Sequence, residues 1–275
     1  MAHISIHRRC RRVAALLALV WAPAFAADPE ASLRLLDQSG DGEALAAEVA
    51  RCTEALANAP HAAAPWRTRR GHAQFRMGSF ELAIADYDAA LADDDRQDEA
   101  WFGRGMARGR NGDIEGGIAD LGTYIARHPQ SSLAHTKRGV RHLWQGDYAH
   151  ARADLERAVA LDPANAEAHD DLGVVYAQAR DYPQAAAHFR AAIRHDASYQ
   201  KAYHNLALAL YLLDEDAAAL TAVDAGLALD PDNRNSLLLR GEILDALGRP
   251  EEARAARSVA ELLPEGNWSE TVPLR

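Results

Sequence analysis

The sequence has very few cysteines, with only Cys10 and Cys52 among its 275 residues. Cys10 falls in an N-terminal segment that we expect to be cleaved, which would leave Cys52 without a partner for a disulfide. Cys52 lies in the helical pattern of residues 43–57, where a buried and inert thiol is favoured over a reactive one. The fold is therefore expected to be held together by packing alone.

Basic residues are also in deficit, with 30 Lys and Arg against 40 Asp and Glu and a net charge of −10. Cleavage of the N-terminal segment would remove four arginines and leave 26 basic and 40 acidic residues, a net charge of −14. Nucleic acids and anionic membranes bind positive surfaces, so this balance argues against both as ligands. Aromatic residues make up only 7% of the chain, which suits helices packed through small side chains.

Long hydrophobic runs are missing as well. The N-terminal apolar stretch, residues 13–21, is about half as long as the ~20 residues that a membrane-spanning helix needs. Four arginines precede it, and Pro23 and the small-residue pattern Ala24-Phe25-Ala26 follow it. This order predicts a signal peptide over residues 1–26, cleaved near Ala26/Ala27, and hence a periplasmic or otherwise exported protein. The alternative is an uncleaved amphiphilic tail. In either case we expect no transmembrane segment in the mature chain.

The sequence also lacks the motifs of common catalytic and metal sites. It has no His-Glu-x-x-His or Cys-x-x-Cys spacing, no Gly-x-Ser-x-Gly elbow and no phosphate-binding glycine loop. The twelve histidines are scattered, and His135 and His169 share a position of the repeat described next with Trp101 and Tyr203, which favours packing over ligation. We therefore expect no enzyme activity, no catalytic residue, no cofactor and no metal site.

A repeat of 34 residues is what the sequence does contain. Glycine or alanine recurs at this spacing, and a small residue follows twelve positions later in every copy. A large apolar residue follows sixteen positions after the glycine in five of six copies, with Arg257 in the last. A residue suited to ending a helix follows seven positions after it. The first of these columns is Gly71, Gly105, Gly139, Gly173, Ala207 and Gly241.

Each copy reads as two antiparallel helices of about twelve residues, joined at the residue seven positions after the first glycine. We call this the second glycine column: Gly78, Gly112, Gly146, Arg180, Asp214 and Gly248. Small residues let the two backbones approach closely, and the large apolar residue fixes the pair. One such hairpin cannot bury its apolar face alone, so stacked copies share a continuous core. Proline between copies, at Pro129, Pro163 and Pro231, stops the preceding helix.

These columns resemble the tetratricopeptide repeat, most clearly at Trp101, Gly105, Ala151, Leu155 and Pro163. The resemblance implies an all-α fold, a right-handed superhelical solenoid of antiparallel helix pairs. Six copies cover residues 64–264. Residues 27–63 read as a degenerate N-terminal repeat or cap, and residues 265–275 as a C-terminal tail.

Two further columns vary together. An arginine precedes the glycine in four copies, and in three of these an aspartate lies sixteen residues after the arginine. Where leucine replaces the arginine, His188 or Ala222 replaces the aspartate. This covariation predicts structural ion pairs within hairpins, although an arginine ladder for anionic ligands is the alternative. Arg240 faces Ala256 in this register, so its partner must come from elsewhere. The expected pairs are Arg70–Asp86, Arg104–Asp120 and Arg138–Asp154.

In tetratricopeptide proteins the first helix of each hairpin lines a concave groove. The resemblance therefore implies a peptide-binding groove with a basic, aromatic N-terminal half and an acidic middle, suited to a peptide with both charge signs. Solvated surface charges are the alternative. The set of residues with which some members grip a terminal carboxylate is not matched at Thr68, His72 or Gly103. The candidate groove residues are Arg69, His72, Phe75, Arg76, Phe102, Arg110, Lys137, Trp144, Asp170, Asp171, Asn205 and Tyr211.

The family resemblance implies an exported adaptor that binds a protein or peptide partner in its groove, by analogy in cell-envelope assembly or turnover. The alternative is a structural scaffold of an envelope secretion or polysaccharide-export assembly, acting or self-associating through its outer surface. Loss of partner binding on changing groove residues would favour the adaptor.

Overall fold

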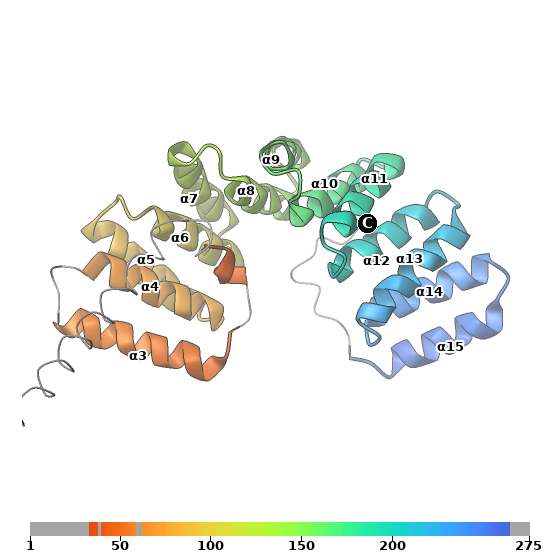
Figure 1. The fold of residues 1–275 in the computed structure, drawn as a ribbon, viewed down its shortest axis with the longest axis horizontal. Coiled ribbons are helices and arrows are strands. Elements are labelled where there is room, and N and C mark those ends of the chain that lie inside the picture. The colour runs from red at the N-terminus through yellow and green to blue at the C-terminus, as the bar shows by residue number, and fades with distance from the viewer. Residues whose placement is uncertain (1–32, 38–39, 59–60, 62, 265–275) are drawn as a thin grey trace, which may run out of the picture. The chain divides into compact units, whose positions relative to one another are not determined.

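The computed structural model describes residues 33–37, 40–58, 61 and 63–264 (Figure 1). The expected signal peptide and C-terminal tail lie outside these residues. Everything described is helix or turn, and no described helix has the length and apolarity to cross a bilayer. The elements are η1 (Leu35–Asp37), α3 (Gly42–Asn58), α4 (Ala63–Arg76), α5 (Phe80–Asp93), α6 (Asp98–Arg110), α7 (Ile114–Arg127), α8 (Ser132–Gln145), α9 (Tyr148–Leu161), α10 (Ala166–Gln178), α11 (Tyr182–His195), α12 (Gln200–Tyr211), α13 (Asp216–Leu229), α14 (Arg234–Ala246) and α15 (Pro250–Glu261).

The chain divides into two compact units, residues 1–107 and 108–275, with the boundary inside α6. In the first unit α4 packs against α5, and α3 packs against α4. In the second, the helices pair as α8 with α9, α10 with α11, α12 with α13 and α14 with α15 (Figure 1). The helices begin and end where the 34-residue period predicts helical hairpins.

Local sequence sets the helix boundaries. Asp113, Asp147 and Asp181, spaced by one repeat, cap α7, α9 and α11 by accepting a hydrogen bond from a backbone N–H of the first turn. The residue of the second glycine column lies in the turn between the two helices of each hairpin, and it has a positive φ in all six copies. Glycine adopts this conformation without steric cost, whereas Arg180 (φ 61°) and Asp214 (φ 60°) adopt it with a side chain.

The first glycine column makes room for the large residue sixteen positions later. A Cβ on Gly173 would lie 2.5 Å from the Phe189 ring, and one on Gly139 would lie 2.9 Å from Leu155. In the last copy the stem of Arg257 takes this place beside Gly241. The close approach of the two helices in a hairpin thus depends on the absence of a side chain at the first glycine column.

We expect Gly173→Ala to lower the free energy of unfolding by about 1–3 kcal/mol, because the rigid Phe189 ring must move to admit the methyl group. Gly122→Ala is the matched control: its Cβ would be 3.5 Å from a flexible Arg138 nitrogen, so the change should stabilise α7 by about 0.5–1 kcal/mol. Urea unfolding of both variants checks this. Equal effects of the two substitutions would contradict the packing argument.

Cys52 is buried in α3, with no exposed surface. Burial, aided by the neighbouring Glu48 carboxylate, raises the pKa of its thiol to about 11. The thiol is therefore protonated at neutral pH and behaves as a small apolar side chain, as the sequence predicted.

Candidate peptide-binding surfaces

The first helices of the hairpins in the second unit lie side by side, since α8 contacts α10, α10 contacts α12, and α12 contacts α14. Polar side chains join them. Lys137 Nζ of α8 donates to both oxygens of Glu167 of α10, at 2.6 and 2.7 Å. A ring nitrogen of His204 in α12 lies 3.1 Å from Ser236 Oγ in α14. We call these cross-repeat contacts, together with the cluster described next, the inner-helix row.

The centre of the inner-helix row is a charged cluster between α10 and α12. Lys201 Nζ lies 3.0 Å from Asp170 Oδ2 and 3.2 Å from Asp171 Oδ1, and Asn205 Nδ2 donates to Asp170 Oδ1 at 2.9 Å. Burial, reinforced by Asp170, raises the pKa of the Asp171 carboxyl against the pull of Lys201. Burial alone would lower the pKa of Lys201, but the two carboxylates raise it well above its usual value. The lysine therefore stays charged and holds the carboxylates together.

This burial corrects part of the predicted groove. Asp170 is 0% exposed, Lys137 and Asp171 are each 5% exposed, and Asn205 is 9% exposed. Their polar atoms bridge adjacent repeats, so these side chains are not the open ligand contacts that the sequence analysis expected. Phe75 (5% exposed) and Phe102 (0% exposed) are core residues for the same reason: their rings are covered by protein. Tyr211 is half-buried and packs against the core of the second unit.

Arg110 and Trp144, two other predicted groove residues, do come together. The Arg110 guanidinium lies 5.9 Å from the centre of the Trp144 ring, and that of Arg141 lies 4.8 Å from it. Both predicted residues are half-buried. A basic and an aromatic side chain thus lie together, from α6 and α8, and their part in a groove stays a prediction.

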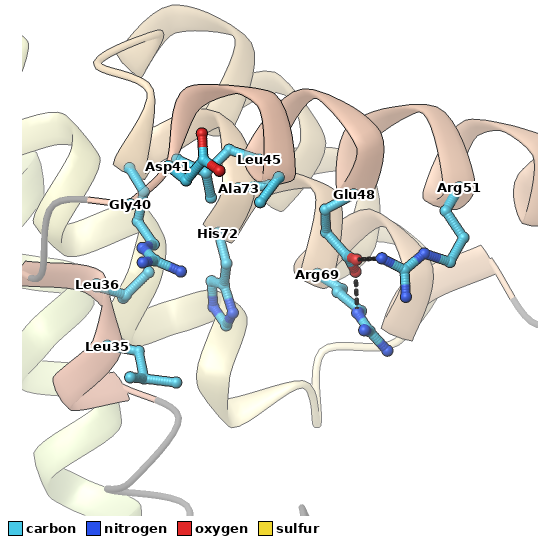
Figure 2. Close-up of a pocket in the computed structure, with 12 residues that line it drawn as sticks. Leu35, Leu36, Gly40, Asp41, Leu45, Glu48, Arg51, Arg69, His72 and Ala73 are labelled. Atoms are coloured by element: carbon cyan, nitrogen blue, oxygen red, sulfur yellow. Dashed lines mark hydrogen bonds and ion pairs between the residues drawn. The ribbon is translucent and has the colours of Figure 1, made fainter.

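The remaining predicted groove residues, Arg69, His72 and Arg76, line a pocket of about 350 Å³ in the first unit. Figure 2 shows that α4 forms one side of it, while α3 and the segment around η1 form the other. Leu35, Leu36, Leu45 and Ala73 supply apolar surface. Sequence reasoning missed the contributions of η1 and α3, because residues 27–63 deviate from the repeat pattern that located the other positions.

Charged side chains line both ends of this pocket: Asp41 and Arg76 lie near Gly40, and Glu48, Arg51 and Arg69 lie at the other end. Glu48 of α3 forms ion pairs with Arg51 and with Arg69 of α4, as the dashed lines in Figure 2 show. Arg69 is about half exposed, whereas Glu48 is largely covered. One protein carboxylate thus lies between two cations at one end of the pocket.

His72 lies between this pocket and the core. Its ring is 5.6 Å from the Tyr87 ring, and its Nε2 atom is buried with no hydrogen-bond partner among the described residues. Burial lowers the pKa of His72 to about 4, against a small opposing effect of a hydrogen bond to the Glu99 backbone. The ring is therefore neutral at physiological pH and contributes shape but no charge to the pocket.

Two of the expected ion pairs lie within one unit each, and both are present. Arg70 donates to the two oxygens of Asp86 at 2.7 and 2.6 Å, and Arg138 donates to those of Asp154 at 2.7 and 2.7 Å. The Asp86 and Asp154 side chains are 9% and 7% exposed. The two pairs are thus structural contacts between the helices of a hairpin.

The third expected pair joins residues of different units. Within their own units, Arg104 pairs with Asp88 at 2.6 Å, and Asp120 accepts from Arg108 at 2.9 Å. Arg240, for which the sequence offered no partner, pairs with Asp224 at 2.6 Å. Asp88 and Asp224 occupy the same repeat position, and each lies sixteen residues before its arginine. A search for aspartates before the arginines would have found this second ion-pair column.

We expect Asp86→Ala to destabilise the first unit by about 1–3 kcal/mol, because it leaves a largely covered arginine without its carboxylate. The double change Arg70→Leu with Asp86→Ala should cost much less, since it reproduces Leu206 and Ala222 of the fifth repeat. Thermal unfolding of the two variants gives the measurement. A double variant that is no more stable than the single one would show that the pair has no such coupling.

Comparison with known proteins agrees with this architecture. The family model described as tetratricopeptide repeat matches five overlapping segments: residues 68–132, 104–166, 136–200, 171–233 and 204–266. Together they cover well over half of the chain. No curated protein matches the sequence significantly.

Solved structures share the fold at low sequence identity. A chain of the APC/C hetero-tetramer Cut9–Hcn1 has a TM-score of 0.73 at 18% identity over 87% of this chain, which spans only 46% of that one. PilF of Pseudomonas aeruginosa has a TM-score of 0.66 at 19% identity, over 74% of this chain and 93% of its own. PilW, a type IV pilus biogenesis factor, has a TM-score of 0.67 at 18% identity, over 73% and 93%.

Proteins of this fold are typically non-catalytic scaffolds or adaptors that bind protein partners. The hairpin geometry, the repeat columns and the matched segments agree with one another. This chain belongs to the tetratricopeptide-repeat family.

Proposed function

We propose that this protein is an exported adaptor that binds an extended peptide segment of a protein partner, with the pocket between α3 and α4 as the anchoring site. The observation that carries the proposal is the pairing of apolar lining, from Leu35, Leu36 and Leu45, with two arginines in one pocket, Arg51 and Arg69. Such a site suits an apolar side chain next to an anionic group. The Arg110–Trp144 surface offers a second, separate contact of the same kind.

Glu48 makes the pocket testable with two substitutions of opposite sign. A ligand carboxylate must displace Glu48 from its arginines or share them with it. Glu48→Gln should therefore raise the affinity for an acidic-apolar peptide, because it removes the competing charge. Arg69→Gln should lower that affinity about tenfold, because it removes half of the anion site. Arg190→Gln is the control, since Arg190 is exposed on α11.

The experiment begins with selection of peptides from a random display library on the full chain, followed by fluorescence anisotropy of the best binder. Opposite effects of Glu48→Gln and Arg69→Gln support the proposal. Equal effects of Arg69→Gln and Arg190→Gln would place binding elsewhere, and failure to select any peptide would count against the adaptor function.

Export is the second part of the proposal. Its support is the order of basic segment, apolar stretch and Ala24-Phe25-Ala26 in the sequence. Likeness in fold to PilF and PilW makes a cell-envelope role a reasonable place to search for the partner. Mass spectrometry of protein from its native host should give Ala27 as the mature N-terminus. An intact Met1 on cytoplasmic protein would overturn the export proposal without affecting the pocket.

A structural scaffold acting through its outer surface is the second candidate. The observation in its favour is the end of α15, where Val259 is 47% exposed and Leu262 is 87% exposed. Sedimentation velocity of the wild type and of Leu262→Glu distinguishes the two. Self-association abolished by Leu262→Glu would favour the scaffold, and a monomer at all concentrations would oppose it.

A further inference from the structure

The turn between α8 and α9 brings together two histidines and an aspartate that the proposed function does not use. His142 lies in the last turn of α8, Asp147 caps α9, and His150 lies in the first turn of α9. Their potential ligand atoms all lie within 4.8 Å of one another. Asp147 Oδ2 is 2.6 Å from His150 Nδ1 and 3.9 Å from His142 Nδ1, and the two rings stack at 5.2 Å.

The backbone conformation of the turn brings these three side chains together. Gly146 has a left-handed conformation with φ of 80°, which reverses the chain at the end of α8. The Oδ1 atom of Asp147 accepts the backbone N–H of His150 as the helix cap, at 3.2 Å. Its other oxygen, Oδ2, is thereby directed toward the two imidazole rings. The negative charge of Asp147 also offsets the positive end of the α9 dipole, which would otherwise repel a cation.

The neighbouring repeats show that this combination is specific to the third hairpin. In the second repeat the corresponding cap is Asp113, and Arg108 occupies the position of His142, with its Nε 3.8 Å from Asp113 Oδ2. Gly116 occupies the position of His150 there. The second repeat thus balances its cap with a fixed cation of the protein. The third repeat instead places histidine ring nitrogens, which can carry a lone pair, around the equivalent carboxylate, that of Asp147.

The Nδ1 atom of His142 is a second, independent observation. It is buried and has no hydrogen-bond partner among the described residues, which is costly for a polar atom unless something else satisfies it. On the other side of the ring, Nε2 faces Asp154 Oδ2 at 4.0 Å, and Asp154 is itself held by Arg138 and His135. A carboxylate that accepts a hydrogen bond from the second nitrogen orients a metal-binding histidine, and a shift of the His142 ring by about 1 Å would bring Asp154 within that distance.

We propose that His142, Asp147 and His150 bind a divalent transition-metal ion of the zinc type, through the two Nδ1 atoms and Asp147 Oδ2. Two imidazoles and a carboxylate suit zinc and its neighbours, whereas magnesium and calcium prefer all-oxygen sites. Bonds of about 2.0–2.1 Å in a tetrahedron place ligand atoms about 3.3 Å apart. The separations of 2.6 and 3.9 Å lie on either side of this value, and no two of the three ligand atoms are more than 4.8 Å apart, so side-chain shifts of about 1–1.5 Å close the site.

His150 is exposed, which gives the ion access from solvent, and the fourth coordination position is left for water or for a ligand from a partner. A bound ion would tie the end of α8 to the start of α9. It would therefore stabilise this hairpin by an amount that grows with the logarithm of the free metal concentration.

The test is titration of the untagged full chain with Zn²⁺ in competition with a chromophoric chelator, and with Co²⁺ followed by visible absorption. The wild type should bind one equivalent at this site, with an absorption typical of low-coordinate Co²⁺. His142→Gln, Asp147→Asn and His150→Gln should each lower the affinity at least tenfold. Asparagine can still cap α9, so Asp147→Asn separates loss of the ligand from loss of the helix.

His188→Gln is the matched control, because His188 Nδ1 lies 3.1 Å from His169 Nδ1 in the next hairpin and forms another close histidine pair. Its affinity for Zn²⁺ at the proposed site should equal that of the wild type. The proposal is overturned if the wild type binds no Zn²⁺, if the three ligand variants bind it unchanged, or if only His188→Gln loses it. Circular dichroism of each variant verifies that the helices remain.

Discussion

Lys201→Met should lower the free energy of unfolding of the second unit by about 3 kcal/mol. The substitution keeps the length and apolar stem of the side chain but removes the charge that lies within 3.2 Å of both Asp170 and Asp171 in the inner-helix row. Asp170 has no exposed surface, so its carboxylate would be left buried beside a second one. Losing one partner of a buried ion pair costs about 3–5 kcal/mol, and we take the lower end because Lys201 is 28% exposed.

Lys137→Met is the matched control for this prediction. Lys137 is as well covered as a core residue, but its partner Glu167 is 36% exposed and can be rehydrated. The change should therefore cost less than about 1 kcal/mol. Urea unfolding followed by circular dichroism gives both values. If Lys137→Met is as destabilising as Lys201→Met, burial of the carboxylate is not what decides the cost.

The second large effect is expected from pH. His72 in the first unit and His204 in the second both have a pKa lowered to about 4 by burial. An unfolded histidine titrates near 6.5, so between pH 6.5 and 4 the unfolded chain binds a proton that the folded one does not. The contribution of each buried histidine to the free energy of unfolding is therefore present in full above pH 6.5, and it is lost as the pH falls toward 4. Each histidine should contribute a loss of about 3 kcal/mol by pH 4.

Single substitutions separate these histidines from the other groups that titrate in the same range. His72→Gln should flatten the pH dependence of the first unit's unfolding, and His204→Gln that of the second. His150→Gln is the control, because His150 is exposed on α9. Chemical unfolding at pH 7.5, 5.5 and 4.5 provides the curves. Parallel curves for the wild type and both buried-site variants would refute the assignment.

The repeat columns predicted most of the fold, because each encodes a local physical requirement. The glycine at the crossing, the large residue facing it and the left-handed residue in the turn correspond to contacts or angles in the structure, as at Gly173, Phe189 and Gly146. The Arg70–Asp86 and Arg138–Asp154 pairs were predictable for the same reason: two columns that change together indicate a contact.

The candidate sites were less predictable, because they depend on burial and on deviations from the repeat. The periodicity located Asp170 and Lys137 on the inner helices but gave no information on whether neighbouring repeats cover them. The pocket beside Arg69 needs η1 and α3, whose sequence lacks the columns. The group His142, Asp147 and His150 matches no common metal motif, since its ligands come together through a turn and a helix cap.

The inner-helix row also bears on how such a chain can evolve. By their columns the six repeats look interchangeable, as if copies could be duplicated, deleted or shuffled freely. The fourth repeat, however, carries Asp170 and Asp171, whose counter-charge is Lys201 of the fifth, and Glu167, whose counter-charge is Lys137 of the third. A rearranged gene that separated the fourth copy from its successor would bury two uncompensated carboxylates. The order of these three repeats is thus fixed by the charge pairs between them, although the shared backbone geometry of the repeats would accept any order.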